Sequence, residues 1–156
     1  MRNFVKRAAV ALAVMVAGIV GISSPAQAAN YGGYVNLGSN YCIDSDANGD
    51  VYTLECNSGY YQDWDIQNIA TDLYYLKNRQ TGRCLDANAS GRVYAIACNG
   101  GEYQRWYRTR VSSAGYGWWQ NNKTKLCLRG SPYVGRQAVV AEACNTSIEG
   151  QKWAKV

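Results

Sequence analysis

The stretch "CLDANASGRVYAIACNGGEYQRW", residues 84–106, occurs in three related copies along the chain. Residues 42–64 read "CIDSDANGDVYTLECNSGYYQDW", and residues 127–153 read "CLRGSPYVGRQAVVAEACNTSIEGQKW". The first cysteines of the copies lie 42 and 43 residues apart, and every copy ends in Gln-x-Trp. An asparagine stands six residues before each first cysteine, at Asn36, Asn78 and Asn121. Self-similarity at a fixed period of this length indicates a repeat architecture.

The repeat also predicts how the six cysteines pair. Six cysteines allow 15 connectivities, but pairing the two cysteines of each copy is the choice that preserves the threefold equivalence. Each bridge then closes a loop of about 15 residues, which contributes roughly 3 kcal/mol in the chain-entropy account. The predicted disulfides are Cys42–Cys56, Cys84–Cys98 and Cys127–Cys144.

The local sequence favours strands within each copy. Segments such as "VYTLEC" and "VYAIAC" are rich in β-branched and aromatic residues, and glycine-containing turns separate them. A copy of about 42 residues holds about four short strands, and three such copies are too few to close a propeller. We therefore expect an all-β protein, a β-trefoil of three repeats of about 42 residues, each with an internal disulfide. The tryptophans of Gln-x-Trp should lie in its core, and each glutamine should hydrogen-bond the adjacent loop.

The first 28 residues are typical of a secretory signal peptide. "MRNFVKR" is basic, an apolar run follows, and Ala26 and Ala28 form an A-x-A cleavage site. The apolar run is shorter than the ~20 residues that a membrane-spanning helix needs. We expect a secreted protein without a membrane span in its mature form. Residues 29–156 would form one domain, with repeats at about 30–70, 71–113 and 114–156.

The composition excludes several kinds of chemistry. The chain has no histidine, which rules out histidine-based triads and histidine metal sites. Three of its 16 basic residues lie in the predicted signal peptide, so the mature chain carries a net charge near +2. This charge is too small to create a strong electrostatic field that attracts nucleic acid. A small glycoside hydrolase would need a pair of carboxylates, but no pair recurs between the copies. We expect no catalytic residues, no cofactor and no nucleic-acid partner.

The segment "DSDANGDVYTLE", residues 44–55, matches a calcium-loop pattern. The equivalent segment of the second copy, "DANASGRVYAIA", keeps the first aspartate and the glycine and loses the other candidate ligands. Residues 51–56 also read as a strand, which would carry Glu55 away from Asp44. We therefore expect no metal site, and weak calcium binding by the acidic first repeat is left open.

The recurring residues are better suited to a sugar. A carboxylate accepts hydrogen bonds from neighbouring hydroxyls, and an asparagine amide both donates and accepts. Tyr52 and Leu54 alternate along a strand with Val51 and Thr53, so they share one face and offer a phenol and an aliphatic surface to a pyranose. A simpler alternative is that Asp44 and Asp86 cap turns. The candidate residues are Asp44, Tyr52, Leu54 and Asn57, with Asp86, Tyr94, Ile96 and Asn99 in the second copy.

With these motifs, the chain resembles the ricin-B-type β-trefoil lectins, and within them the actinohivin-like mannose-binding branch. The resemblance covers essentially all of residues 30–156 and implies glycan binding through the same pockets, with Tyr61 and Tyr103 added beside the glutamines. The galactose-binding branch carries an aromatic residue where Leu54 and Ile96 stand here, so mannose-type glycans are favoured. Because a fold does not fix function, a protein-binding trefoil, an inhibitor or toxin component without sugar binding, is the alternative.

The third copy departs from this pattern. Arg129 stands in place of the aspartate, Val140 in place of the tyrosine and Glu142 in place of the aliphatic residue, and three residues are inserted between its cysteines. We expect that this copy does not bind mannose.

Overall fold

The computed structural model describes residues 31–110 and 115–156, so the predicted signal segment lies outside the described residues. Over these ranges the chain forms thirteen short strands and two 3-10 turns, η1 (Glu102–Gln104) and η2 (Glu149–Gln151). Repeat one contributes β1 (Tyr34–Asn36), β2 (Cys42–Ser45), β3 (Val51–Leu54) and β4 (Trp64–Ala70). Repeat two contributes β5 (Leu73–Asn78), β6 (Cys84–Ala87), β7 (Val93–Ile96) and β8 (Trp106–Arg110). Repeat three contributes β9 (Tyr116–Asn121), β10 (Cys127–Arg129), β11 (Gln137–Ala138), β12 (Val140–Glu142) and β13 (Trp153–Lys155).

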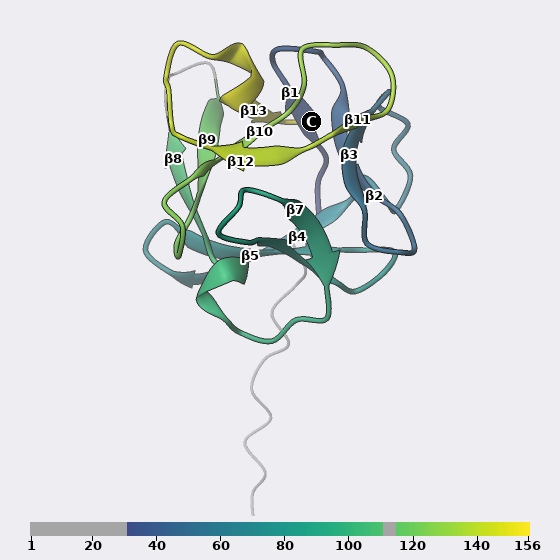
Figure 1. The fold of residues 1–156 in the computed structure, drawn as a ribbon. Coiled ribbons are helices and arrows are strands. Elements are labelled where there is room, and N and C mark those ends of the chain that lie inside the picture. The colour runs from purple at the N-terminus through teal and green to yellow at the C-terminus, as the bar shows by residue number, and fades with distance from the viewer. Residues whose placement is uncertain (1–30, 111–114) are drawn as a thin grey trace, which may run out of the picture.

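The first and last strands of each repeat form a closed barrel (Figure 1). Antiparallel pairing runs from β4 through β5, β8, β9 and β13 to β1. The backbones of Gly32 and Trp64 then exchange hydrogen bonds of 3.2 and 3.1 Å, which joins β4 to the segment before β1. Closure of this ring leaves the barrel strands paired on both sides. The prediction of an all-β trefoil is confirmed.

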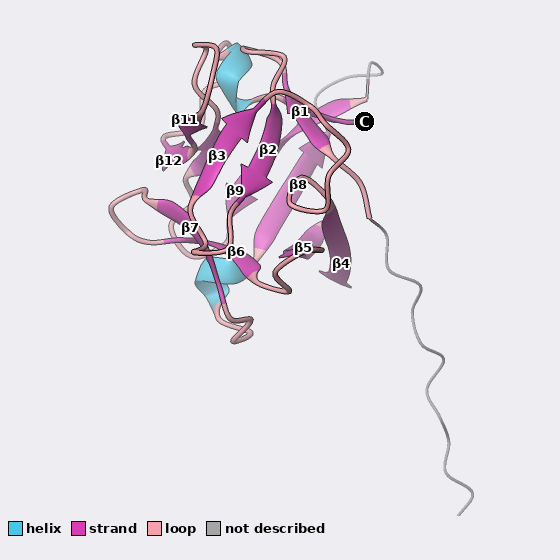
Figure 2. Cartoon of the chain, turned by 90° about the vertical axis from the view of Figure 1, so that its right-hand side faces the viewer, coloured by secondary structure: helices cyan, strands magenta, loops and turns pink. Residues whose placement is uncertain are grey.

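The middle strands of each repeat form a hairpin, and the three hairpins meet at one end of the barrel (Figures 1 and 2). The hairpins touch through backbone hydrogen bonds of 2.8 Å from Ala95 N to Gly49 O and from Ala141 N to Gly91 O. Gly49 and Gly91 have φ of +93° and +82°, and a Cβ there would lie 2.1 and 2.3 Å from the carbonyl oxygens of Ala95 and Ala141. The glycine that recurs in the first two copies is therefore required by this close approach.

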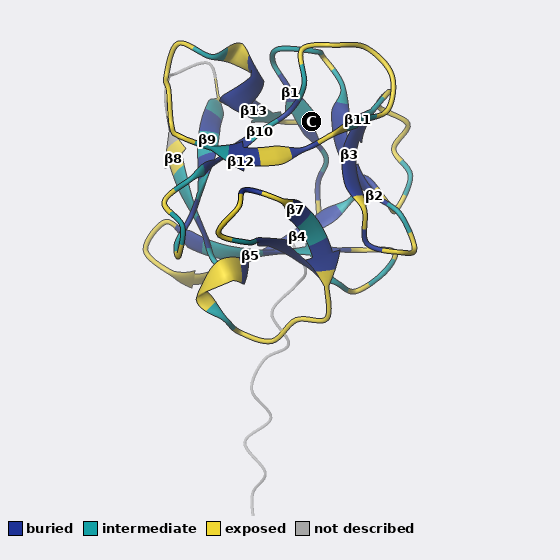
Figure 3. Cartoon of the chain, in the orientation of Figure 1, coloured by how far each residue is buried: buried dark blue, intermediate teal, exposed yellow. Residues whose placement is uncertain are grey.

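The core confirms the predicted place of the repeated tryptophans. Trp64, Trp106 and Trp153 are each 0% exposed, and Figure 3 shows the buried residues on the strands and exposed ones mainly on the loops. Their indole N–H groups donate to the backbone carbonyls of Ile43, Leu85 and Leu128 at 3.3, 3.0 and 3.0 Å. Each tryptophan thus joins the last strand of its repeat to the hairpin.

The predicted disulfides are also confirmed, with S–S distances of 2.00 to 2.01 Å in all three pairs. The repeated asparagines have a role that the sequence did not indicate. Their side-chain amides donate across repeat boundaries to the carbonyl that precedes each Gln of Gln-x-Trp, at 2.6 to 2.7 Å. The pairs are Asn78 with Tyr61, Asn121 with Tyr103 and Asn36 with Gly150. None of the helices formed by the described residues is long and apolar enough to cross a membrane.

Candidate functional site

The predicted aspartate and tyrosine of each of the first two repeats lie side by side. Asp44 is the cross-strand partner of Tyr52, and Asp86 is the cross-strand partner of Tyr94. Residues directly opposite each other in an antiparallel pair project from the same face. The register of each hairpin therefore brings a carboxyl group and a phenol together in both repeats.

The glutamine of Gln-x-Trp holds the Asp44 carboxyl group. Gln62 Nε2 donates to Asp44 Oδ2 at 2.9 Å and to the carbonyl of Glu55 at 2.9 Å, and its Oε1 accepts from Asn57 N at 2.9 Å. The loop contact was predicted, and the contact with the aspartate was not. Gln62 already binds one carboxylate oxygen of Asp44. The sequence suggested that both oxygens would be available to a ligand, and this expectation is wrong for Asp44.

In repeat two, Gln104 makes the same contacts with its adjacent loop. Asn99 N donates to Gln104 Oε1 at 2.9 Å, and Gln104 Nε2 donates to the carbonyl of Ala97 at 3.1 Å. Gln151 makes the same two loop contacts in repeat three, with Asn145 N and the carbonyl of Ala143. These contacts therefore belong to the trefoil repeat in all three copies.

Both carboxyl groups are almost fully buried. Asp44 is 3% exposed and Asp86 is 4% exposed. Burial raises the pKa of each aspartate, and hydrogen bonding from the paired glutamine and tyrosine partly offsets the increase. Asp44 Oδ1 is buried and has no hydrogen-bond partner among the described residues. A buried acceptor in this condition is uncommon, and a ligand hydroxyl can reach it only when a covering side chain moves.

The tyrosine beside each aspartate remains a hydrogen-bond donor. Burial and the negative charge of Asp44 raise the pKa of Tyr52 to about 12. Burial, followed by the charge of Asp86, also raises the pKa of Tyr94. Both phenols therefore keep their protons at neutral pH.

The other predicted residues are more exposed than the aspartates. Leu54 is half-buried, while Ile96 is 38% exposed and Tyr61 and Tyr103 are 37% exposed each. Asn57 and Asn99 are exposed, but their side-chain oxygens accept from Gly59 N and Gly101 N at 2.8 and 2.7 Å. Their amide groups can still donate, so they offer a ligand less than the donor-and-acceptor role expected from the sequence.

The turn-capping alternative applies to different residues. Asp46 Oδ1 accepts from the backbone N–H groups of Asn48, Gly49 and Asp50 at 2.9, 3.0 and 3.1 Å. Asn88 caps the equivalent turn in repeat two. The calcium-like spacing thus includes a turn cap, and Asp46 Oδ2 is bonded to Arg136 Nη2 at 2.7 Å. Among the described residues no group of three potential metal ligands is present.

In repeat three an ion pair stands where the other repeats have the aspartate and the aliphatic residue. Arg129 Nη1 lies 2.8 Å from Glu142 Oε2, and Glu142 Oε1 accepts from Gln151 Nε2 at 3.2 Å. Glu142 thus takes over the bond to the glutamine, and its charge is neutralised by Arg129. This geometry agrees with the expectation that the third copy does not bind the same sugar.

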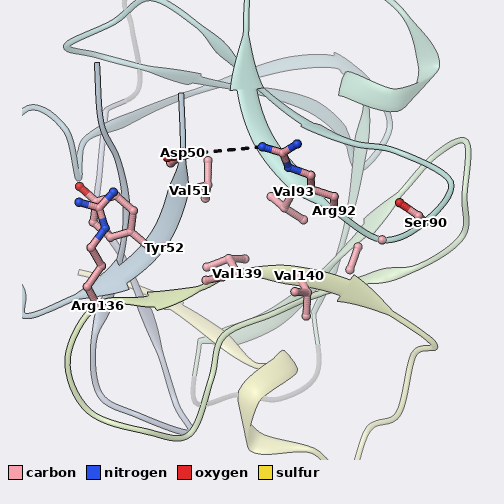
Figure 4. A pocket seen from close by; sticks show the side chains of 12 residues that line it. Asp50, Val51, Tyr52, Ser90, Arg92, Val93, Arg136, Val139 and Val140 are labelled. Atoms are coloured by element: carbon pink, nitrogen blue, oxygen red, sulfur yellow. Dashed lines mark ion pairs between the residues drawn. The ribbon is translucent and has the colours of Figure 1, made fainter. Parts of the chain in front are cut away.

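A separate hollow of about 600 Å³ lies where the three hairpins meet. Val51, Val93 and Val139 form its floor, and Asp50 and Arg92 face each other across it at 4.0 Å (Figure 4). Tyr52 is the one predicted site residue that lines it. The hollow borders repeat one through Tyr52 and Arg136, and neither Asp44 nor Asp86 lines it.

Comparison with known proteins gives a family match. A family model described as "Ricin-type beta-trefoil lectin domain" matches residues 30–153. No curated protein matches the chain in sequence.

Solved structures share the fold at low sequence identity. A designed threefold symmetric protein, ThreeFoil, has a TM-score of 0.73 and 23% identity over 81% of this chain and 97% of its own. An exo-beta-1,3-galactanase from Clostridium thermocellum has a TM-score of 0.71 and 19% identity over 83% of this chain, which spans 30% of that enzyme. The cytolethal distending toxin of Haemophilus ducreyi has a TM-score of 0.69 and 12% identity over 81% of this chain and 83% of the toxin chain. At these identities the neighbours show the trefoil fold alone.

Proposed function

Because the chain belongs to the ricin-type beta-trefoil lectin domain family, we propose that it is a secreted, non-catalytic protein that binds glycans through the pockets of repeats one and two. The observation that carries this proposal is a buried aspartate beside a tyrosine in both repeats, with the Gln-x-Trp glutamine bonded to the aspartate of repeat one at 2.9 Å. A carboxylate fixed in this way accepts a strong hydrogen bond from a sugar hydroxyl. The more exposed predicted residues supply apolar contact and amide donors.

We further propose that the preferred ligands are mannose-type glycans. The support is the resemblance to actinohivin-like lectins together with the aliphatic side chains of Leu54 and Ile96, where galactose-binding relatives carry an aromatic platform. A site that contacts only one or two sugars engages few ligand atoms, so a single sugar should bind weakly. Glycans whose branches reach two pockets would gain from avidity.

A glycan array of the chain without residues 1–28 tests the function. We expect signal on mannose-terminated glycans and at least about tenfold less on galactose-terminated ones, a difference of about 1.4 kcal/mol. Incubation with mannan should release no sugar, because a binding module cleaves no bond. A signal confined to galactosides would contradict the proposed specificity.

The protein-binding alternative has one observation in its favour. Tyr133 and Val134 are each 72% exposed at the tip of the insertion in repeat three, and exposed aromatic residues are enriched at protein interfaces. A blank array, together with recovery of one stoichiometric protein partner from culture supernatant, would favour this function over the lectin.

The raised pKa values predict a pH dependence of binding. An aspartate whose pKa is raised in the folded state takes up a proton at a pH above the ordinary value of about 3.9. The folded state then binds protons more readily than the unfolded state, so protonation of Asp44 and Asp86 does not destabilise the fold.

We therefore expect affinity to fall on the order of tenfold as these carboxylates are protonated, because a neutral acceptor loses the charge-assisted part of the bond. The loss should occur at a pH where circular dichroism still reports the folded protein. Affinity that decreases only in parallel with unfolding would contradict this prediction.

A further inference from the structure

The two proposed pockets differ in what covers their tyrosines. The guanidinium of Arg136 lies over the ring of Tyr52, with its carbon 3.7 Å from the ring centroid. The same group is bonded to Asp46 Oδ2 at 2.7 Å, and Figure 4 shows its side chain beside that of Tyr52. Tyr52 is accordingly only 8% exposed, whereas Tyr94 is half-buried.

The insertion in repeat three explains why this contact occurs in one pocket. Ala138 is the cross-strand partner of Tyr52 in the adjacent repeat, and Asp50 is the equivalent partner of Tyr94. Between Gly49 and Val51 lies one residue, whereas between Gly135 and Val139 lie three. The longer loop extends toward repeat one and brings Arg136 across the tyrosine.

Among the residues that the structure describes, repeat two has no equivalent cover. The cation nearest its tyrosine ring is Arg92, whose guanidinium carbon is 5.8 Å from the centroid of Tyr94. Arg92 is directed toward Asp50, at a distance of 4.0 Å. The aliphatic residue is also more exposed in repeat two, since Ile96 is 38% exposed and Leu54 is half-buried.

We propose that Arg136 makes the two pockets unequal: it occupies the face of Tyr52 that a sugar would contact, so repeat two is the stronger saccharide site and repeat one binds after Arg136 is displaced. This inference rests on the proposed function. A ligand that must displace a protein group binds with an affinity reduced by the fraction of the protein in the open state. Arg136 is held by a cation–π contact and an ion pair together, both partly exposed, so the reduction should be moderate.

Backbone amides allow the two pockets to be measured separately. Asn57 N and Asn99 N each donate to the glutamine that borders the pocket of their own repeat. Titration of ¹⁵N-labelled protein with methyl α-mannoside, followed at these two amides, gives one dissociation constant for each pocket. In the unmodified protein we expect the dissociation constant at Asn57 to be on the order of tenfold larger than that at Asn99. This is the ratio for a pocket that is open about one-tenth of the time.

Arg136→Ala should bring the two constants within about twofold of each other by strengthening binding at Asn57. Arg136 has a half-exposed side chain, so the variant should fold normally. Arg92→Ala is the matched control, since it removes the guanidinium near Tyr94 and should leave the constant at Asn99 within about twofold of its original value.

Unchanged or weaker binding at Asn57 in Arg136→Ala would overturn the inference, and weaker binding would mean that Arg136 contacts the sugar. If Asn99 responds to the mannoside while Asn57 is indifferent to the substitution, the inference fails and the proposed function stands. If neither amide responds in either protein, both fail together.

Discussion

A variant carrying both Asp44→Ala and Asp86→Ala is expected to lose detectable glycan binding while keeping its fold. Each substitution removes a charge-assisted hydrogen bond to the sugar, which contributes about 1.5–3 kcal/mol, or roughly 10- to 150-fold in affinity for each pocket. The third copy should not compensate, because Arg129 and Glu142 occupy its equivalent position. Glycan-array signal and far-UV circular dichroism together measure the effect.

The fold should persist because the glutamine that contacts the aspartate has other partners. Without Asp44, Gln62 still donates to the carbonyl of Glu55 and accepts from Asn57. Asp72→Asn is a suitable control, since Asp72 is an exposed residue in the turn between β4 and β5. Array binding that survives in the double variant would show that the sugar is held elsewhere.

Trp106→Ala is expected to cause the largest loss of stability. The side chain is 0% exposed and donates to the Leu85 carbonyl at 3.0 Å. Truncation of a buried aromatic residue costs roughly 3–5 kcal/mol, a large part of the 5–15 kcal/mol that typically stabilises a domain. Chemical denaturation monitored by circular dichroism would measure the change in the free energy of unfolding.

Two further variants keep this prediction testable if Trp106→Ala does not fold. Trp106→Phe retains most of the volume and loses the indole hydrogen bond, so it should cost about 1–2 kcal/mol. Trp118→Ala removes a tryptophan that is only half-buried and should cost clearly less than Trp106→Ala. Equal losses at the two tryptophans would contradict the assignment of Trp106 as a core anchor.

The repeated motifs were sufficient to predict the architecture. The period of 42 to 43 residues, the two cysteines in each copy and the closing Gln-x-Trp indicated three equivalent β-rich units, and the trefoil and its disulfides follow that prediction. The alternation predicted along residues 51–54 is only partly seen, since Tyr52 is buried together with Val51 and Thr53. The trefoil and its disulfides could be predicted because they depend on the spacing of cysteines and Gln-x-Trp motifs within short segments, and this spacing recurs in three copies.

The candidate pockets were predicted in part. Comparison of the copies identified the aspartates and tyrosines, and the hairpin register brings them together. Their burial was not expected, nor was the contact from Gln62 to Asp44. Both depend on how the end of a repeat folds back onto its own hairpin. The equal spacing from aspartate to glutamine in the first two copies was a signal that could have suggested this contact.

The sequence by itself determined a disulfide-linked β-trefoil with two similar copies and one divergent copy, because strand periodicity and cysteine spacing are properties of short segments. Only the tertiary structure decided that the two similar pockets are covered differently. Arg136 and Asp46 are 90 residues apart in the chain, and they meet because a lengthened loop of one repeat crosses the hairpin of another. Contacts of this kind depend on the approach of loops of unequal length, a quantity that no local pattern in the sequence encodes.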